Sequence, residues 1–138
     1  MAVGFTVMFY WYHVGTGDFL HSFFSTIAFN LENKKWGSKY PVIMNQLYSG
    51  ELEAAEIESA MRELDSIEQE LKKYPPDKVV WDIEDLSKQP PWGSKISSDI
   101  TDLSNYFVTS DGENLIDVLR RALAKGLELK MNVKISTL

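Results

Sequence analysis

The sequence predicts an α+β fold, a single domain in which a small, mostly antiparallel sheet is covered by three or four helices. Its 138 residues, 44% of them hydrophobic and 12% aromatic, suit one domain with one sizeable core. Apolar residues alternate with period two in some segments and recur every three or four positions in others, which indicates both strands and helices. No internal repeat or linker divides residues 1–138, so we expect them to form one unit.

The N-terminal segment predicts a strand followed by a helix. Between residues 3 and 12 the side chains alternate between two faces, with aromatic residues on both. The expected faces carry Val3, Phe5, Val7, Phe9 and Trp11 on one side and Thr6, Met8, Tyr10 and Tyr12 on the other. Gly15-Thr16-Gly17 ends this strand, and Asp18 opens a helix whose wide apolar stripe ends at Leu31. The narrow polar face of this helix consists of His21, Ser22, Ser25 and Thr26.

Two further helices are predicted in the middle of the chain. After a polar loop over residues 32–41, a short helix spans about 41–48 and stops at Gly50. A longer helix spans about 53–73, because apolar residues recur there every three or four positions while Glu and Lys cover the outside. Pro75-Pro76 ends this helix.

A second strand and a long loop are predicted next. Val79, Trp81 and Ile83 alternate with Val80, Asp82 and Glu84, which is typical of a strand. A loop of about twenty residues follows, and loops of this length are often functional.

The C-terminal part predicts a short strand, a helix and a closing strand. The short strand covers residues 106–109, and Ser110 with Glu113 has the spacing of a capping box before a helix over about 113–127. The closing strand covers about 131–136. It is a candidate for an exposed edge that would pair with a second copy in a homodimer.

Composition narrows the classes of cofactor and partner. Cysteine is absent, which excludes disulfides and thiolate metal sites, and we expect a cytoplasmic protein without a cofactor. No secretion signal and no run of eighteen apolar residues is visible, so the sequence predicts no membrane partner. The net charge of −6 argues against nucleic acid as a direct ligand, because phosphate binding needs clustered lysine and arginine.

Acidic residues are concentrated in the middle of the chain. Residues 51–81 and 82–113 each carry a net charge of −5, whereas residues 1–50 carry +1 and residues 114–138 carry +3. Such an acidic field raises the association rate of a basic partner and repels polyanions. We therefore expect a basic protein as the partner.

The stretch from Trp81 to Gly93 is the leading candidate for a functional site, because carboxylates follow directly after apolar residues. On a strand, Asp82 and Glu84 would point to one face about 7 Å apart, an arrangement that can hold Mg²⁺ or act as acid and base. Asp85, Asp99 and Asp102 are candidates to join them in space. Three interpretations stay open: solvated carboxylates at a strand end, an acidic docking surface, and a metal-dependent hydrolase.

Other chemistry-bearing residues give weaker signals. His13 and His21, the only histidines, match no metal-ligand spacing and are distant in sequence from the carboxylates. Trp92, within Pro90-Pro91-Trp92-Gly93, has two interpretations. It either fastens the loop to the core or is exposed as an anchor for a partner, since tryptophan often dominates binding energy.

Several strings of the sequence resemble the immunity protein 70 family of bacterial polymorphic toxin systems, and together they cover most of the chain. They are Gly4-Phe5, Phe9-Tyr10-Trp11-Tyr12, Phe19 to Ile27, Trp36-Gly37-Ser38, Tyr40-Pro41, Met44-Asn45, Trp81 to Leu86, Pro90 to Gly93 and Ile100 to Gly112. The resemblance implies an antitoxin-like protein in the producing cell that binds the C-terminal toxic domain of a cognate toxin. It brings no catalytic residues with it.

Resemblance and charge together favour a binding protein over an enzyme. An acidic domain suits a basic toxin domain such as a nuclease, whose cleft it would cover by charge complementarity. We expect the contact residues to be Asp82, Glu84, Asp85, Trp92, Asp99 and Asp102. A hydrolase that uses Asp82 and Glu84 with a divalent metal, and a regulatory protein-binding module, are the alternatives.

Overall fold

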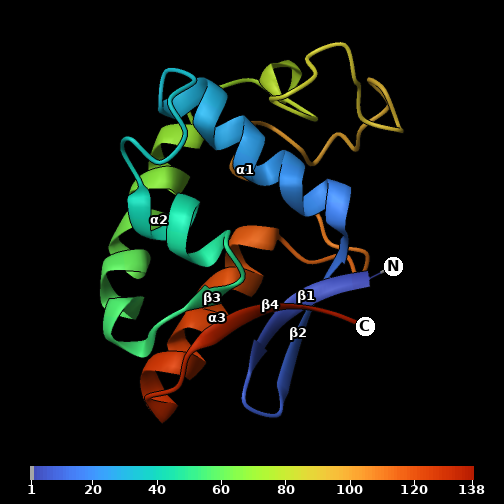
Figure 1. The fold of residues 1–138 in the computed structure, drawn as a ribbon. Helices are drawn as coiled ribbons and strands as arrows, with labels where there is room; N and C mark the ends of the chain where they lie inside the picture. The colour runs from blue at the N-terminus through green and yellow to red at the C-terminus, as the bar shows by residue number, and fades with distance from the viewer. Residues whose placement is uncertain (1) are drawn as a thin grey trace.

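The computed structural model describes residues 2–138 and confirms the predicted α+β fold (Figure 1). Within these residues a four-stranded antiparallel sheet, in the order β2-β1-β4-β3, is combined with three main helices. The strands are β1 (Ala2–Val7), β2 (Tyr10–Thr16), β3 (Glu51–Leu52) and β4 (Val133–Thr137). The main helices are α1 (Gly17–Leu31), α2 (Ile57–Leu71) and α3 (Leu115–Leu129). Shorter elements are the π-helix η1 (Val42–Leu47) and the 3₁₀ turns η2 (Ala54–Glu56) and η3 (Pro76–Lys78).

The single strand predicted over residues 3–12 is wrong, because this segment is a hairpin. β1 and β2 pair antiparallel through a two-residue turn at Met8 and Phe9, which leaves Phe9 93% exposed instead of on the buried face. The turn contains none of the Gly, Asn or Asp residues that usually mark such a hairpin. The alternation of side-chain types therefore runs through the turn and predicts one long strand. Met8 takes a left-handed backbone conformation, with φ at 52°.

The closing strand is internal to the sheet, so the predicted exposed edge at 131–136 is wrong. β4 lies between β1 and β3, with Ile135 opposite Phe5 on one side and Val133 opposite Leu52 on the other. The longer free edge belongs to β2. A homodimer formed by strand pairing along β4 is not compatible with this order.

Side-chain caps begin two of the main helices. The Thr16 hydroxyl accepts the Phe19 N–H at 3.2 Å at the start of α1. At the start of α3, the Asn114 side chain accepts the Ile116 N–H at 2.8 Å, so Asn114 is the cap in place of the predicted Ser110 and Glu113 pair. η1 confirms the short helix predicted over about 41–48, and α2 confirms the long one with narrower bounds than the predicted 53–73.

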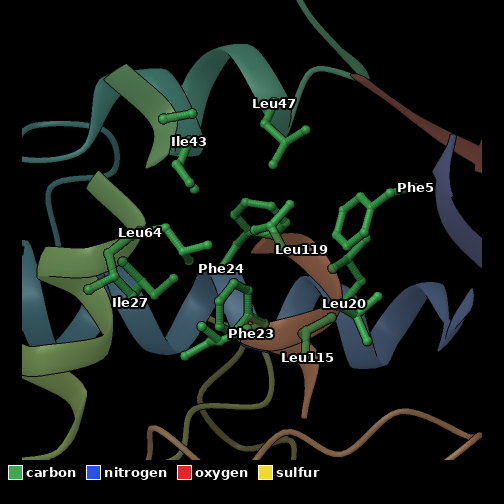
Figure 2. Packing of buried hydrophobic residues seen from close by; sticks show 14 of the residues in the cluster. Phe5, Leu20, Phe23, Phe24, Ile27, Ile43, Leu47, Leu64, Leu115 and Leu119 are labelled. Atoms are coloured by element: carbon green, nitrogen blue, oxygen red, sulfur yellow. The ribbon is translucent and has the colours of Figure 1, made fainter. Parts of the chain in front are cut away.

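One hydrophobic core joins the sheet to the helices. Figure 2 shows side chains from β1, α1, η1, α2 and α3 pointing toward one another, and all but Leu20 of those labelled are fully buried. Phe23 and Phe24 of α1 contact each other edge to face, with ring centroids 5.8 Å apart. Each buried Phe or Leu side chain contributes about 1.5–3 kcal/mol of transfer free energy. This packing fixes the position of α1, on which the candidate site is built.

Two predicted strands are wrong, because residues 79–113 contain no named strand. Residues 79–83 are irregular, and residues 106–109 contribute one isolated bridge, between Val108 and Asn114. Val80 is the buried residue of the first segment, whereas Trp81 and Ile83 are partly buried and pack against the core. No helix in the described part of the chain is long and apolar enough to cross a membrane.

Candidate functional site

The acidic loop, which we define as residues 79–106, lies along the polar face of α1. Ser22 Oγ donates a hydrogen bond to the Val80 carbonyl oxygen at 2.8 Å. Thr26 Oγ1 donates to the same oxygen at 3.1 Å and accepts the Val80 N–H at 3.0 Å. Ser25 Oγ accepts the Ile83 N–H at 3.2 Å. Three hydroxyls of one helix therefore replace the strand partners that this segment lacks.

The same three hydroxyl residues are fully buried, although their pattern in the sequence is that of a helix face open to water. Buried hydroxyls need partners, and here the backbone of the acidic loop supplies them. In Figure 1 the loop runs beside α1, as these contacts require. The polar face of α1 is thus a docking strip for the loop.

Asp82 lies at the start of the acidic loop beside His21, which is 61 positions away in sequence. Its Oδ1 is 3.3 Å from His21 Nε2 and accepts the Glu84 N–H at 2.9 Å, and its Oδ2 is 3.5 Å from Lys88 Nζ. The Glu84 N–H and, to a smaller extent, His21 hold the pKa of Asp82 below its usual value. Asp82 therefore stabilises the turn that carries Glu84 and Asp85.

His21 is held in turn by an aromatic cluster of α1, the 32–41 loop and η1. Its Nδ1 is 2.8 Å from the Tyr48 hydroxyl, and its ring stacks on Trp36 with centroids 6.1 Å apart. Trp36 Nε1 donates to the Met44 carbonyl oxygen at 2.7 Å. Burial, with a smaller contribution from Glu84 and Asp82, raises the pKa of Tyr48. This cluster was not visible in the sequence, because no local spacing joins its members.

A hollow of about 300 Å³ lies beside this cluster. Asp18, His21, Trp81, Asp82, Lys88 and Gln89 line it. Asp82 and Glu84 do not form the predicted pair on a strand face, because the chain turns between them. Within residues 2–138, no three His, Asp or Glu side chains come together in a way that could hold a metal ion.

The other predicted contact carboxylates stand at separate points of the loop. Glu84 is exposed, and its carboxylate makes no hydrogen bond within the described residues. Asp85 is exposed and accepts from the hydroxyl and N–H of Ser87, which lower its pKa. Asp99 is exposed and contacts Ser97 Oγ at 3.4 Å.

Asp102 is partly buried and holds the far end of the loop. It accepts hydrogen bonds from the hydroxyl and N–H of Ser104 and from the Thr101 hydroxyl at 3.0 Å. Burial acts to raise the pKa of Asp102, but the Ser104 and Thr101 hydrogen bonds lower it overall. Its neighbour Leu103 is buried and donates its N–H to the Tyr74 carbonyl oxygen at 3.0 Å.

Trp92 fastens the acidic loop, as the first of its two interpretations expects, and is also partly exposed. It is 38% exposed, its Nε1 donates to the Tyr106 hydroxyl at 2.8 Å, and its ring meets Trp81 edge to face with centroids 5.4 Å apart. One side of the indole thus fastens the loop, and the other side remains accessible.

Two apolar hollows flank this tryptophan region. The larger one, of about 500 Å³, is lined among others by Pro75, Pro90, Ile96 and Tyr106. The smaller one, of about 290 Å³, includes Trp92 and shares Ile96 and Tyr106 with the larger. The acidic loop therefore carries both exposed carboxylates and concave apolar surface, and protein interfaces use both kinds of surface.

Comparison with known proteins gives one match. The model of a family described as Immunity protein 70 matches residues 5–135, which is nearly the whole chain and includes the entire acidic loop. No curated protein and no solved structure matches the chain.

Proposed function

Because the chain belongs to the immunity protein 70 family, whose role is toxin neutralisation, we propose that it binds a basic domain of its cognate toxin through the acidic loop. The single observation that carries this proposal is the exposed position of Glu84, Asp85 and Asp99 on a loop that is docked by buried hydrogen bonds. The toxin domain is the C-terminal one, and binding takes place in the cytoplasm of the producing cell.

The structure supports a division of work among the six expected contact residues. Asp82 and Asp102 hold the loop, since their carboxylates accept hydrogen bonds from the chain itself. Glu84, Asp85 and Asp99 meet lysine or arginine of the toxin. The accessible side of Trp92, with the hollows beside it, receives apolar side chains of the partner.

Binding, without a chemical step, is the proposed mode of action. Charged rim residues mainly raise the association rate, while a central aromatic anchor slows dissociation. An acidic loop around a half-buried tryptophan provides both. A toxin domain that binds nucleic acid would carry the complementary basic surface.

The test is charge reversal at two exposed positions, Glu84→Lys with Asp99→Lys. We expect the double variant to fold normally, to bind the purified toxin domain at least about tenfold more weakly and to fail in rescuing cells from the toxin. Asp82 is left unchanged, because its replacement would also loosen the loop.

The matched control is Glu53→Lys with Glu58→Lys. Both residues are exposed near the start of α2, and the pair changes the net charge by the same four units. It should keep full affinity and protection. Full protection by the Glu84 and Asp99 variant, or equal losses in the two double variants, would show that the acidic loop is not the binding surface.

A further inference from the structure

The sheet has an open face that no helix covers. On β1, Val3, Phe5 and Val7 are buried against the helices, whereas Gly4 and Thr6 point the other way. The register places Trp11, Thr6, Lys134 and Glu51 side by side across the four strands on this second face. Figure 1 shows the three main helices gathered on the opposite side of the sheet.

The open face is hollowed beside the β1–β2 turn. A hollow of about 480 Å³ is lined by Thr6, Met8, Met131, Lys134, Ser136 and Glu51, together with two neighbouring residues. A cavity of about 150 Å³ accommodates a benzene molecule, so this hollow has ample room for a phenyl ring. Met8 and Met131 make part of its wall apolar, and they are 52% and 39% exposed.

The turn beside the hollow displays a phenylalanine. Phe9 is 93% exposed, and Tyr10 next to it is 48% exposed. Met8 holds φ at 52°, a left-handed conformation that is unfavourable for a residue other than glycine. A two-residue turn with positive φ at its first residue favours glycine there, so Met8 is kept at this position at a cost to the stability of the monomer. Exposed apolar clusters of this kind mark interaction sites.

We propose that the open sheet face is a homodimer interface in which Phe9 of each copy enters the hollow of the other. Two-fold symmetry requires each copy to supply both the projecting ring and the hollow. Phe9 directly follows Met8, which lines the hollow, so both features lie at the same end of the open face. This assignment goes beyond toxin binding and does not depend on it.

Charge favours a second copy as the occupant. The chain carries −6 overall, with −5 in each of the segments 51–81 and 82–113, so most of its surface repels another copy. The hollow in the open face is different, because its lining carries Lys130 and Lys134 against Glu51, a net charge of +1. Two copies joined by this face avoid contact between their acidic segments and keep their acidic loops on the outside, and the small positive charge of each face is attracted by the net charge of −6 on the other copy. The toxin surface stays free in the dimer.

The test is the molar mass of the full chain by sedimentation velocity, over a concentration range of about 1–200 μM. The native protein should reach twice the 15.8 kDa chain mass. Phe9→Asp should raise the dimer dissociation constant at least about a hundredfold, because the contact is lost twice in each dimer. Ser136→Trp, which fills the hollow without touching the ring, should have the same effect.

Leu138→Asp is the matched control. Leu138 is 82% exposed on the same sheet, but at the end next to Ala2, far along β1 from the turn. This variant should remain dimeric, and all variants should keep the circular dichroism spectrum and toxin affinity of the native chain. A monomeric native protein at 200 μM overturns the proposal, as does a dimer that survives both substitutions. A native monomer whose toxin affinity falls in Phe9→Asp would assign this face to the toxin instead.

Discussion

Thr26→Val tests whether the acidic loop is held by the hydroxyls of α1. Valine has the shape of threonine, so the substitution removes two hydrogen bonds, to the N–H and the carbonyl oxygen of Val80, with little change in packing. The Val80 N–H then has no partner at a position that is only 9% exposed. An unsatisfied buried donor costs about 1–3 kcal/mol. For a chain of this size, that lowers Tm by about 3–10 °C.

Ser22→Ala should cost less, because the Val80 carbonyl oxygen keeps its bond from Thr26. We expect about 0.5–1.5 kcal/mol for this variant. When both hydroxyls are absent, the carbonyl oxygen loses its remaining partner as well. The double variant should therefore lose more stability than the two single variants added together.

Urea denaturation measures the global free energy of unfolding, and hydrogen exchange reports on the loop itself. In Thr26→Val, amides of residues 79–106 should exchange faster than in the native protein. The exchange rates of amides in α3 should increase only as much as the decrease in the global free energy of unfolding requires. Thr137→Val is the control, since Thr137 is exposed and its hydroxyl makes no hydrogen bond within residues 2–138. If Thr26→Val changes neither the free energy of unfolding nor the exchange of the loop, the hydroxyls of α1 do not hold it.

Two further predictions concern the scaffold. Gly126→Ala should destabilise the protein by about 1–3 kcal/mol in urea denaturation, because an added Cβ would lie 2.8 Å from Ile57 Cδ1, and this overpacking outweighs the gain in helix propensity. The exposed variant Ala124→Gly should lose only about 1 kcal/mol, and a stabilised Gly126→Ala would show that the helix can shift away. The hydrogen bonds from Ser104 lower the pKa of Asp102 in the folded protein. The ionised Asp102 carboxylate therefore stabilises the folded state fully at pH values above the ordinary aspartate pKa of about 3.9. This stabilisation is lost as the pH falls through the lower pKa of the folded state. Urea midpoints between pH 7 and pH 2 should thus decrease less steeply in Asp102→Asn, and equal slopes for both proteins would contradict this role.

The fold class followed from the periodicity of the sequence, and the errors have physical causes. Residues 3–12 alternate in type without interruption, and the turn position with the left-handed backbone conformation is occupied by Met8 instead of the usual glycine or asparagine, so the sequence does not mark the turn. Periodicity also assigned a strand to residues 79–83. Alternation reports which side chains are covered, but it does not show whether a neighbouring strand or a helix face covers them.

The candidate site was predictable as a segment but not as a geometry. The loop of about twenty residues predicted after residues 79–84 is long and irregular in the structure, whereas Asp82 and Glu84 were expected on a strand that does not form. The contact between Asp82 and His21 joins residues 61 positions apart, so no local pattern could indicate it. A signal was present in Ser22, Ser25 and Thr26. Three hydroxyl residues on an otherwise apolar helix are typical of buried docking as well as of a solvated face.

The docking of the acidic loop also bears on how tightly it can bind. A loop of this length that moved freely in the unbound protein would lose conformational entropy on binding and weaken the complex. Here the backbone hydrogen bonds of Val80 and Ile83, and the contacts of Trp92 with Tyr106, restrain the loop before any partner arrives. The carboxylates that fasten the loop and those that face solvent are different residues. Charge on the exposed ones can therefore vary to suit a particular toxin without loss of the loop conformation, whereas changes at Asp82 or Asp102 would affect both.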